Sequence, residues 1–219
     1  MDETTRQKKQ RALWDKLASS YDSRVLKTYE NAYDLSIQKV RSILSFDHQV
    51  LEIGCGTGII SLGIAPFVKK VIATDISPSM ISSAKGKADN LSIQNIDFRV
   101  CNDYSLPYDN HSFDVILLFN TLHWVQDPFL LLQEAHRLLK PSGYLASATD
   151  CYAEPAPLPT RLMLGVQKLL HLIGVIPFGW HFKTQDIDKL FTRCHFSIAE
   201  TNVLHQIPVN YYLLARKQP

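Results

Sequence analysis

The feature that most constrains the fold is a run of glycines directly after an apolar stretch, in the sequence V-L-E-I-G-C-G-T-G. Gly54, Gly56 and Gly58 occupy every second position. Glycine is needed where a strand turns tightly into a helix, because a Cβ would forbid the backbone angles and keep a ligand at a distance. A second apolar run ends at Asp75, where an acid can accept hydrogen bonds from ribose hydroxyls. The pattern predicts a βαβ unit that binds a nucleotide.

The glycine spacing separates one class of nucleotide from another. A dinucleotide-binding loop reads G-x-G-x-x-G, and its third glycine would fall at Ile59, whereas the observed glycine is one position earlier. Glu52, directly before the loop, does not suit a pyrophosphate at the start of a helix. A ligand with a cationic centre and an amino-acid moiety suits it better, and S-adenosylmethionine has both. The glycines alone would also allow a turn without a ligand.

Strands and helices alternate along most of the chain. Apolar runs predict strands at 49–53, 71–74, 97–101, 115–119 and 144–149, and helical spacing predicts helices at 6–18, 29–44, 59–67, 78–88 and 128–139. Two further strands, at 195–203 and 207–216, should pair as a hairpin, since we expect no crossover helix between them. The alternation predicts a mostly parallel sheet with helices on both faces and a ligand beyond the carboxyl ends of its strands.

Five sequence blocks follow one another between residues 14 and 150. They are V-L-E-I-G-C-G-T-G, V-I-A-T-D-I-S-P-S-M-I-S-S-A-K, L-P-Y-D-N-H-S-F-D-V-I-L, L-H-W-V-Q-D-P and L-L-K-P-S-G. Together they resemble the class I S-adenosylmethionine-dependent methyltransferases, and most of all the subgroup of quinone-biosynthesis and other small-molecule enzymes. The resemblance implies an enzyme that uses S-adenosyl-L-methionine and releases S-adenosyl-L-homocysteine. It also implies an α/β, Rossmann-like, doubly wound and mostly parallel seven-stranded sheet with an antiparallel C-terminal hairpin.

The resemblance assigns roles to individual side chains. Backbone groups around Gly54 should meet the methionine amino group, Asp75 the ribose, and Asn120 the methionine end. Apolar side chains just after Asp75 should enclose the adenine, although Met80 could equally be an ordinary core residue. Tyr21 resembles a tyrosine that reaches the cofactor carboxylate. The candidate cofactor-binding residues are Tyr21, Glu52, Gly54, Cys55, Gly56, Gly58, Asp75, Ile76, Met80, Asn102, Asp103, Tyr104 and Asn120.

One position departs from the family pattern. Relatives carry an aspartate four residues before the Leu-Pro pair, where it receives the adenine amino group. Here that position is Asn102, and Asp103 follows it. An asparagine carbonyl can accept the same bond without charge assistance, so either Asn102 substitutes or the loop shifts to let Asp103 serve.

His123, in N-T-L-H-W, is the candidate catalytic residue. It follows the fourth predicted strand on the loop nearest the expected methyl group, where a base could deprotonate the acceptor. The alternative is that the His-Trp pair only fills space between that strand and the next helix. The sequence favours neither decisively.

Composition excludes several other classes. A chain of 219 residues with 46% hydrophobic residues suits one domain, and a net charge of +2 gives no global attraction to nucleic acid. The four cysteines lie far apart, so we expect no metal site, and Cys55 is small enough to fit its loop without a catalytic role. The charged start of the chain shows no secretory signal, which favours a cytoplasmic protein.

The expected organisation is a single methyltransferase domain, 1–219. It comprises a helical cap at 1–47, a cofactor-binding core at 48–150, an insertion at 151–194 and the hairpin at 195–219. An amphipathic helix over about 159–176 is too interrupted to cross a membrane, and it could be a lid, a core helix or a peripheral membrane contact. As a lid it implies an apolar or aromatic acceptor.

The function predicted from the sequence is methyl transfer from S-adenosylmethionine to a small acceptor. The alternative is a non-catalytic partner that keeps a methyltransferase fold to bind the cofactor or another protein. Base-methylating enzymes resemble one another in an N-P-P-Y-like turn, and this chain has N-T-L-H there. The sequence leaves the acceptor, the methylated atom and the oligomeric state open.

Overall fold

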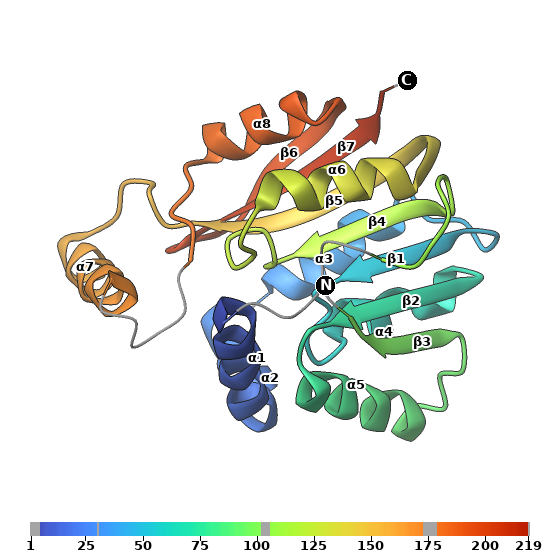
Figure 1. Ribbon diagram of the computed structural model, residues 1–219, viewed down its shortest axis with the longest axis horizontal. Helices are drawn as coiled ribbons and strands as arrows, with labels where there is room; N and C mark the ends of the chain where they lie inside the picture. Colours follow the sequence, from blue (N-terminus) through green and yellow to red (C-terminus); the bar gives the residue numbers. More distant parts are fainter. Residues whose placement is uncertain (1–4, 30, 102–105, 173–178, 219) are drawn as a thin grey trace.

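A seven-stranded sheet runs through the molecule in the order β3-β2-β1-β4-β5-β7-β6 (Figure 1). The structure is a computed structural model that describes residues 5–29, 31–101, 106–172 and 179–218. The strands are β1 (Gln49–Ile53), β2 (Lys70–Asp75), β3 (Ile96–Val100), β4 (Phe113–Phe119), β5 (Leu139–Cys151), β6 (Phe196–Gln206) and β7 (Val209–Lys217).

Strands β1 to β5 pair in parallel, and β7 inserts antiparallel between β5 and β6. The sequence-based prediction of a mostly parallel seven-stranded sheet with an antiparallel C-terminal hairpin is therefore confirmed. The strand order reverses between β1 and β4, so their carboxyl ends diverge into the crevice where such sheets bind ligands. The register pairs Asp150 of β5 with Asn210 of β7, which brings two polar side chains to this same edge.

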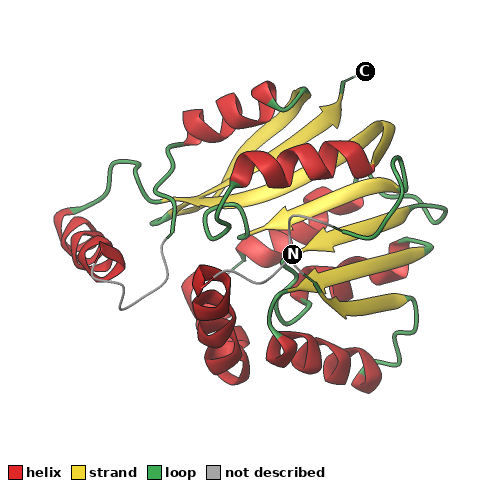
Figure 2. Cartoon of the chain, in the orientation of Figure 1, coloured by secondary structure: helices red, strands yellow, loops and turns green. Residues whose placement is uncertain are grey.

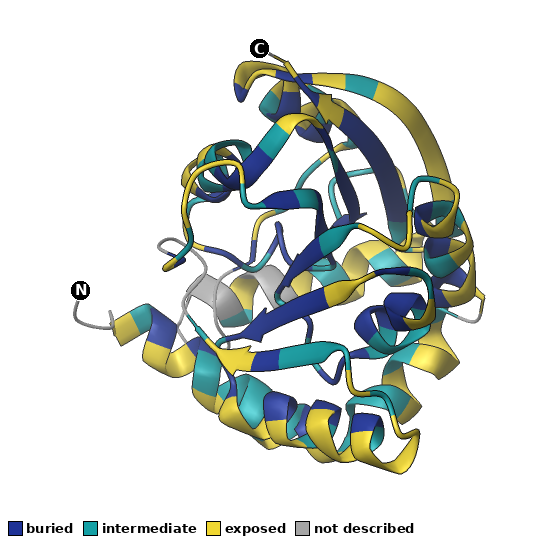
Figure 3. Ribbon diagram, turned by 90° about the vertical axis from the view of Figure 1, so that its right-hand side faces the viewer, coloured by how far each residue is buried: buried dark blue, intermediate teal, exposed yellow. Residues whose placement is uncertain are grey.

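Helices cover both faces of the sheet (Figure 2). They are α1 (Thr5–Leu17), α2 (Tyr21–Tyr29), α3 (Ala32–Arg41), α4 (Ile59–Ile64), α5 (Pro78–Asn90), α6 (Pro128–Leu138), α7 (Leu158–Leu172) and α8 (Thr184–Arg193). Alternate residues of a strand point to opposite faces, so Leu51 and Ile53 pack with α6 and α8, while Val50 packs with α3 and α4. The strands β1, β2, β4, β5 and β7 are accordingly mostly buried on both sides, whereas most residues of the edge strands β3 and β6 are half-buried or exposed (Figure 3).

The helix starts that flank the crevice follow from local sequence. Ser77 accepts a hydrogen bond from the Met80 N–H and precedes Pro78, as expected for a capped first turn. Asp127 caps α6 in the same way, accepting from the backbone of Phe129 and Leu130. Helix α5 therefore begins directly beyond the end of β2, whereas the loop 120–127 separates α6 from the end of β4.

Two helical predictions need correction. The helix expected at 29–44 is the shorter α3, and α2, which precedes it, was not expected. Helix α2 has no fully buried residue, and its core-facing side chains, Val25 and Tyr29, are only half-buried. Helix α8 was not expected between β5 and the hairpin, and it packs Ile187 and Phe191 into the core.

Three helices lie at the edge of the sheet where β1, β4 and β5 end. Helices α1 and α2 lie against the ends of the central strands, and α7 stands further out, beyond β5 (Figure 1). Among the residues that the structure describes, no helix is both long and apolar enough to cross a membrane.

Candidate functional site

The glycine loop turns away from β1 while remaining attached to β2. The backbone N–H groups of Gly54 and Cys55 both donate to the Thr74 carbonyl oxygen, at 2.8 and 2.9 Å. Gly54 has φ +74°, and a Cβ there would lie 2.4 Å from the Thr121 hydroxyl oxygen. No other residue fits this position, because both the backbone angle and the contact with Thr121 exclude a side chain.

Asp75 occupies the carboxyl end of β2, as predicted. Its Oδ2 accepts from the Gly56 N–H and its Oδ1 from the Ser77 N–H, both at 2.8 Å. Burial raises the pKa of this carboxyl to about 6, while those two N–H groups oppose the shift. Asp75 is therefore ionised at neutral pH, and each oxygen retains a lone pair for a further donor such as a ribose hydroxyl.

Glu52 is buried beneath the loop and accepts a hydrogen bond from the Ser61 hydroxyl of α4. Burial raises the pKa of its carboxyl to about 8, because water no longer solvates the charge. Glu52 therefore holds a proton at neutral pH in this structure, unlike the anion that the sequence suggested. A cation bound nearby would lower this pKa and restore the charge.

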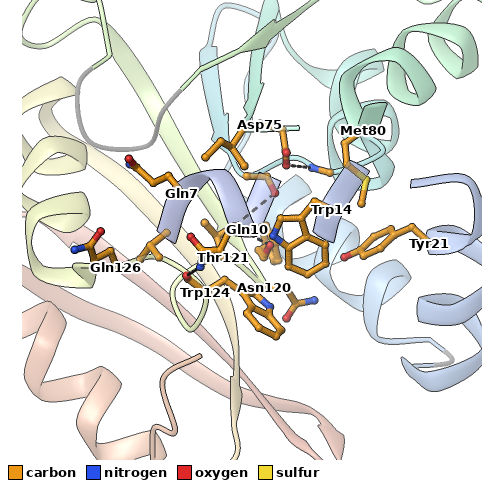
Figure 4. A pocket seen from close by; sticks show the side chains of 15 residues that line it. Gln7, Gln10, Trp14, Tyr21, Asp75, Met80, Asn120, Thr121, Trp124 and Gln126 are labelled. Atoms are coloured by element: carbon orange, nitrogen blue, oxygen red, sulfur yellow. Dashed lines mark hydrogen bonds between the residues drawn. The ribbon is translucent and has the colours of Figure 1, made fainter. Parts of the chain in front are cut away.

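A cavity of about 680 Å³, including its open mouth, adjoins the loop; we call it the cofactor cavity (Figure 4). Seven predicted residues line it, together with side chains that the sequence analysis did not propose. The lining residues are Gln7, Gln10, Trp14, Tyr21, Gly54, Gly56, Asp75, Ile76, Met80, Phe119, Asn120, Thr121, Trp124, Val125 and Gln126. The volume is typical of a pocket for a nucleoside-sized ligand.

The walls of this cavity suit an adenosine bearing a polar tail. Met80 and Ile76 supply apolar surface next to the Asp75 carboxylate. Of the described part of the chain, only the Tyr21 ring, at 3.7 Å, would lie near a Cβ at Gly56, so the backbone there is accessible to a ligand. The chemistry of the described lining residues and the volume of the cavity therefore fit the expected cofactor.

Helices α1 and α2 are tied to the loops around the cofactor cavity. Gln10 donates to the Trp124 carbonyl oxygen, and the rings of Trp14 and Trp124 meet edge to face with centroids 5.2 Å apart. Asp15 accepts from the Ser77 hydroxyl and from the Ser79 N–H, at 2.5 and 3.1 Å. Asp22 in α2 accepts from Thr57 and pairs with Lys87 at 2.7 Å. These bonds fix the helices as one wall of the cavity.

Asn120 follows β4 with φ +53° and lines the cofactor cavity. Its side-chain Oδ1 accepts from Asn210 Nδ2 at 2.8 Å, and its own Nδ2 donates to the Tyr33 hydroxyl at 3.4 Å. Tyr33 lies 3.5 Å from the Tyr21 hydroxyl. Burial raises the pKa of both phenols, so they stay protonated and can donate to a ligand such as a carboxylate.

His123 does not line the cofactor cavity. It is 1% exposed, its ring contacts those of Trp124 and Tyr152, and its Nε2 lies 4.0 Å from Asp150 Oδ2. Burial lowers the pKa of the imidazole to about 4, although Asp150 opposes the shift. The ring is therefore neutral at pH 7, the form that can take up a proton.

The remaining predicted residues are Gly58, Cys55 and the segment 102–104. Gly58 begins α4 at φ +79°, and a Cβ there would lie 3.1 Å from Ala84, so its role is in packing. Cys55 lies beside Glu52 on a smaller adjoining cavity, and burial raises the pKa of its thiol well above normal, as expected for an inert thiol. Asn102, Asp103 and Tyr104 lie outside the described residues.

Sequence reasoning missed the inner face of α1 and the polar residues at the ends of β5 and β7. Gln7, Gln10 and Trp14 share one face of α1, but a pattern sought among apolar residues passes over the two glutamines. Asn210 becomes meaningful only through the antiparallel pairing that places it next to Asp150. Both depend on tertiary contacts.

Comparison with known proteins identifies relatives of this chain. Residues 51–147 match a family model described as a methyltransferase domain. A demethylmenaquinone methyltransferase of Oceanobacillus iheyensis is 31% identical over 146 residues, which are 57% of this chain and 61% of that protein. The uncharacterized methyltransferase YcgJ of Bacillus subtilis is 29% identical over 131 residues, 60% of this chain and 51% of its own length. The chain thus spans about half to three fifths of these relatives.

A solved structure supports the same fold over nearly the whole chain. It is the complex between the Haloferax volcanii Trm112 methyltransferase activator and a putative methyltransferase, with a TM-score of 0.78. The match covers 94% of this chain and 98% of that chain at 15% identity. At this identity the likeness shows the fold alone.

Proposed function

We propose that this chain, whose residues 51–147 match a methyltransferase domain, transfers a methyl group from S-adenosylmethionine to a small, apolar or aromatic acceptor. The observation that carries the proposal is Asp75 at the floor of a 680 Å³ cavity beside a G-x-G-x-G loop. An ionised carboxylate at that position suits ribose hydroxyls, and the early third glycine does not suit a dinucleotide.

The cofactor would be held by residues from four strand ends and from α2. Asp75 would take the ribose hydroxyls, and Met80 and Ile76 would flank the adenine. Gly54, Gly56 and Asn120 would face the methionine part, and the neutral phenol of Tyr21 would donate to its carboxylate. Asn102, Asp103 and Tyr104 remain proposed contacts to the adenine.

The chemistry asked of the protein is modest. When bound, S-adenosylmethionine supplies a methyl group already activated by its sulfonium sulfur, so alignment accounts for most of the catalysis. A protic acceptor must also lose its proton, and His123 is the base that we propose for this step. Its neutral imidazole supports that role, whereas its burial behind Trp124 and Tyr152 requires one of these rings to move.

The acceptor class follows from the walls of the site. Trp14 and Trp124 line the open side of the cofactor cavity, and no lysine or arginine is among the described lining residues. Aromatic walls without a cation favour an uncharged, flat acceptor over a carboxylate or phosphate. One relative, named for its action on demethylmenaquinone, is consistent with this class.

We propose that α7 acts as a lid over the acceptor. Its apolar residues Leu162, Val166 and Leu169 are exposed, so it does not pack as a core helix. Peripheral membrane contact is the remaining alternative from the sequence. Liposome co-sedimentation of the wild type and of Leu169→Asp tests it: binding lost in the variant would support membrane contact, and no binding by either would dismiss it.

The second candidate function is that of a non-catalytic partner with the same fold. It would bind the cofactor without turnover, so binding alone does not separate the two. Incubation with methyl-labelled S-adenosylmethionine and a metabolite extract does, with label followed by mass. Label on an extract component that disappears with Asp75→Ala supports the enzyme, and cofactor binding without any labelled product supports the partner.

A further inference from the structure

A buried polar cluster lies where β5 ends and β7 begins, behind the cofactor cavity. At its centre is Asp150, which is 2% exposed. Its Oδ2 accepts from the hydroxyls of Tyr29 and Tyr152, and its Oδ1 accepts from Asn210 Nδ2 at 2.8 Å. All three neighbours donate, so both carboxylate oxygens act as acceptors. A carboxylate buried this deeply needs such donors, and here three separate elements supply them.

One side of the cluster reaches the cofactor cavity. Asn210 donates through the same Nδ2 to Asp150 and to Asn120 Oδ1, at 2.8 Å in each case. This fixes which end of the Asn120 amide faces Tyr33 and the cavity. Asp150 therefore acts on the cavity wall through two bonds, although it does not itself line that wall.

The other side of the cluster reaches His123. The distance of 4.0 Å from Nε2 to Asp150 Oδ2 exceeds a hydrogen bond, so the attraction is electrostatic and grows when the ring is charged. The opposite nitrogen, Nδ1, is buried and has no hydrogen-bond partner among the described residues. A buried polar atom without a partner in a site of this kind requires an explanation.

We propose that Asp150 is the positioning residue for methyl transfer, holding His123 with its proton on Nε2 and its Nδ1 open to the acceptor, and holding Asn120 through Asn210. This inference rests on the proposed function. It also restricts the acceptor to a group that loses a proton as it is methylated, such as a phenol, an enol or an amine.

The step balances without any further reagent. The bond from the acceptor atom to the methyl carbon forms while the carbon–sulfur bond of the donor breaks, and its electron pair stays on sulfur. The proton of the acceptor passes to Nδ1 of His123. The products are a methylated acceptor, a neutral thioether and an imidazolium that the Asp150 carboxylate stabilises.

The acceptor reaches this point from the side of α7. A second cavity of about 680 Å³, including open space, lies at the base of α7, and Tyr152 lines it. Tyr152 also contacts His123 and donates to Asp150 at 2.9 Å. A movement of this one side chain would therefore connect the second cavity with the imidazole.

The decisive measurement is the tautomer of His123 at pH 7, read from ¹⁵N chemical shifts of histidine-labelled protein without ligand. We expect the Nε2–H tautomer in the wild type, because that proton faces Asp150. In Asp150→Asn the carboxylate is lost and an amide N–H can face Nε2, so we expect the Nδ1–H form to rise at least tenfold relative to wild type. A structural role alone would not move this signal.

Further variants separate the effect of Asp150 on His123 from its effect on Asn120. Asn210→Leu should preserve the tautomer but weaken S-adenosylhomocysteine binding about tenfold by calorimetry, since Asn120 loses its partner. Asp188→Asn, which alters another tyrosine-bonded carboxylate on α8, should change neither reading. An Nδ1–H tautomer in the wild type would overturn the proposal, and so would an unchanged tautomer in folded Asp150→Asn.

The wild-type tautomer needs no variant, so a variant that fails to fold leaves the proposal testable. Failure of the proposed function is seen separately, as absence of S-adenosylhomocysteine binding to the wild type. A wild type that binds S-adenosylhomocysteine but carries the Nδ1–H tautomer would refute the role of Asp150 and leave the proposed function intact.

Discussion

Two regions at the same edge of the sheet are built in opposite ways. Around the cofactor cavity, α1 and α2 are attached by Gln10, Asp15 and Asp22, and the polar groups beneath them are buried and bonded. Beyond β5, α7 exposes Leu162, Met163 and Val166 and stands apart from the sheet (Figure 1). A site that must bind one cofactor needs a fixed geometry, whereas a surface that receives an acceptor must be able to move.

Matched glycines should show the largest contrast between the two regions. Gly54→Ala places a Cβ 2.4 Å from Thr121 Oγ1 at φ +74°, so we expect a loss of about 3 kcal/mol in stability and no measurable S-adenosylhomocysteine binding. Gly165→Ala in α7 meets nothing within 4 Å among the residues that the structure describes, and it should raise helix stability by about 0.5 kcal/mol. Thermal unfolding and calorimetry check both, and a benign Gly54→Ala would contradict the rigid cavity.

The next largest contrast in stability is expected between two methionines, one in each region. Met80 is fully buried against the cofactor cavity, and Met163 in α7 is 59% exposed. We expect Met80→Ala to cost about 3 kcal/mol and Met163→Ala less than about 0.5 kcal/mol. Urea unfolding measures both. Equal losses would mean that α7 is packed in solution and that the two regions do not differ as described.

These contrasts also mark what the sequence could predict. Strand β1 was predicted with its observed bounds, because Val50, Leu51 and Ile53 are apolar and the glycine loop follows directly. Gly54 and Asp75 were predicted because their roles depend on local backbone and strand ends. Helix α2 was missed because its core-facing residues, Val25 and Tyr29, are only half-buried, and α8 because it buries only Ile187 and Phe191.

The cluster around Asp150 was beyond sequence reasoning for a different reason. Its members are far apart in the chain: Tyr29 lies in α2, His123 after β4 and Asn210 in β7. None belongs to a repeating pattern, and their proximity depends on the antiparallel insertion of β7. His123 was identified from its place after β4, but its partner could not be.

The buried Glu52 should make stability depend on pH. Its pKa of about 8 lies above the ordinary value of 4.5, so the folded protein holds a proton that the unfolded chain has lost, and stability falls as pH rises from 4.5 to about 8. We expect Glu52→Gln to remove this slope and to be about 2 kcal/mol more stable than wild type at pH 8. Ser61→Ala, which removes the hydroxyl bonded to Glu52, should extend the slope to higher pH.

Denaturant unfolding between pH 5 and 9 measures this slope. The control is the wild type with S-adenosylhomocysteine, whose ammonium group should lower the pKa of Glu52 and flatten the curve. Identical slopes for wild type and Glu52→Gln would show that Glu52 is ionised in the folded protein. Water would then reach its carboxyl more than the burial of Glu52 indicates.

The smallest expected effect is the pH dependence of binding. The pKa of Asp75 is about 6, and the ionised form accepts the ribose hydroxyls, so affinity for S-adenosylhomocysteine should fall about tenfold from pH 7 to pH 5. Asp75→Asn has no such titration and should bind weakly at both values. A pH-independent wild type would remove Asp75 from ribose recognition.

The central claim, that the G-x-G-x-G loop and Asp75 form an S-adenosylmethionine site, is tested most directly by calorimetric titration at pH 7. The titrations use wild type and Asp75→Asn, with S-adenosylhomocysteine and NAD as ligands. We predict that wild type binds S-adenosylhomocysteine, that Asp75→Asn binds it at least tenfold more weakly, and that neither binds NAD. Binding of NAD together with no binding of S-adenosylhomocysteine would contradict the account.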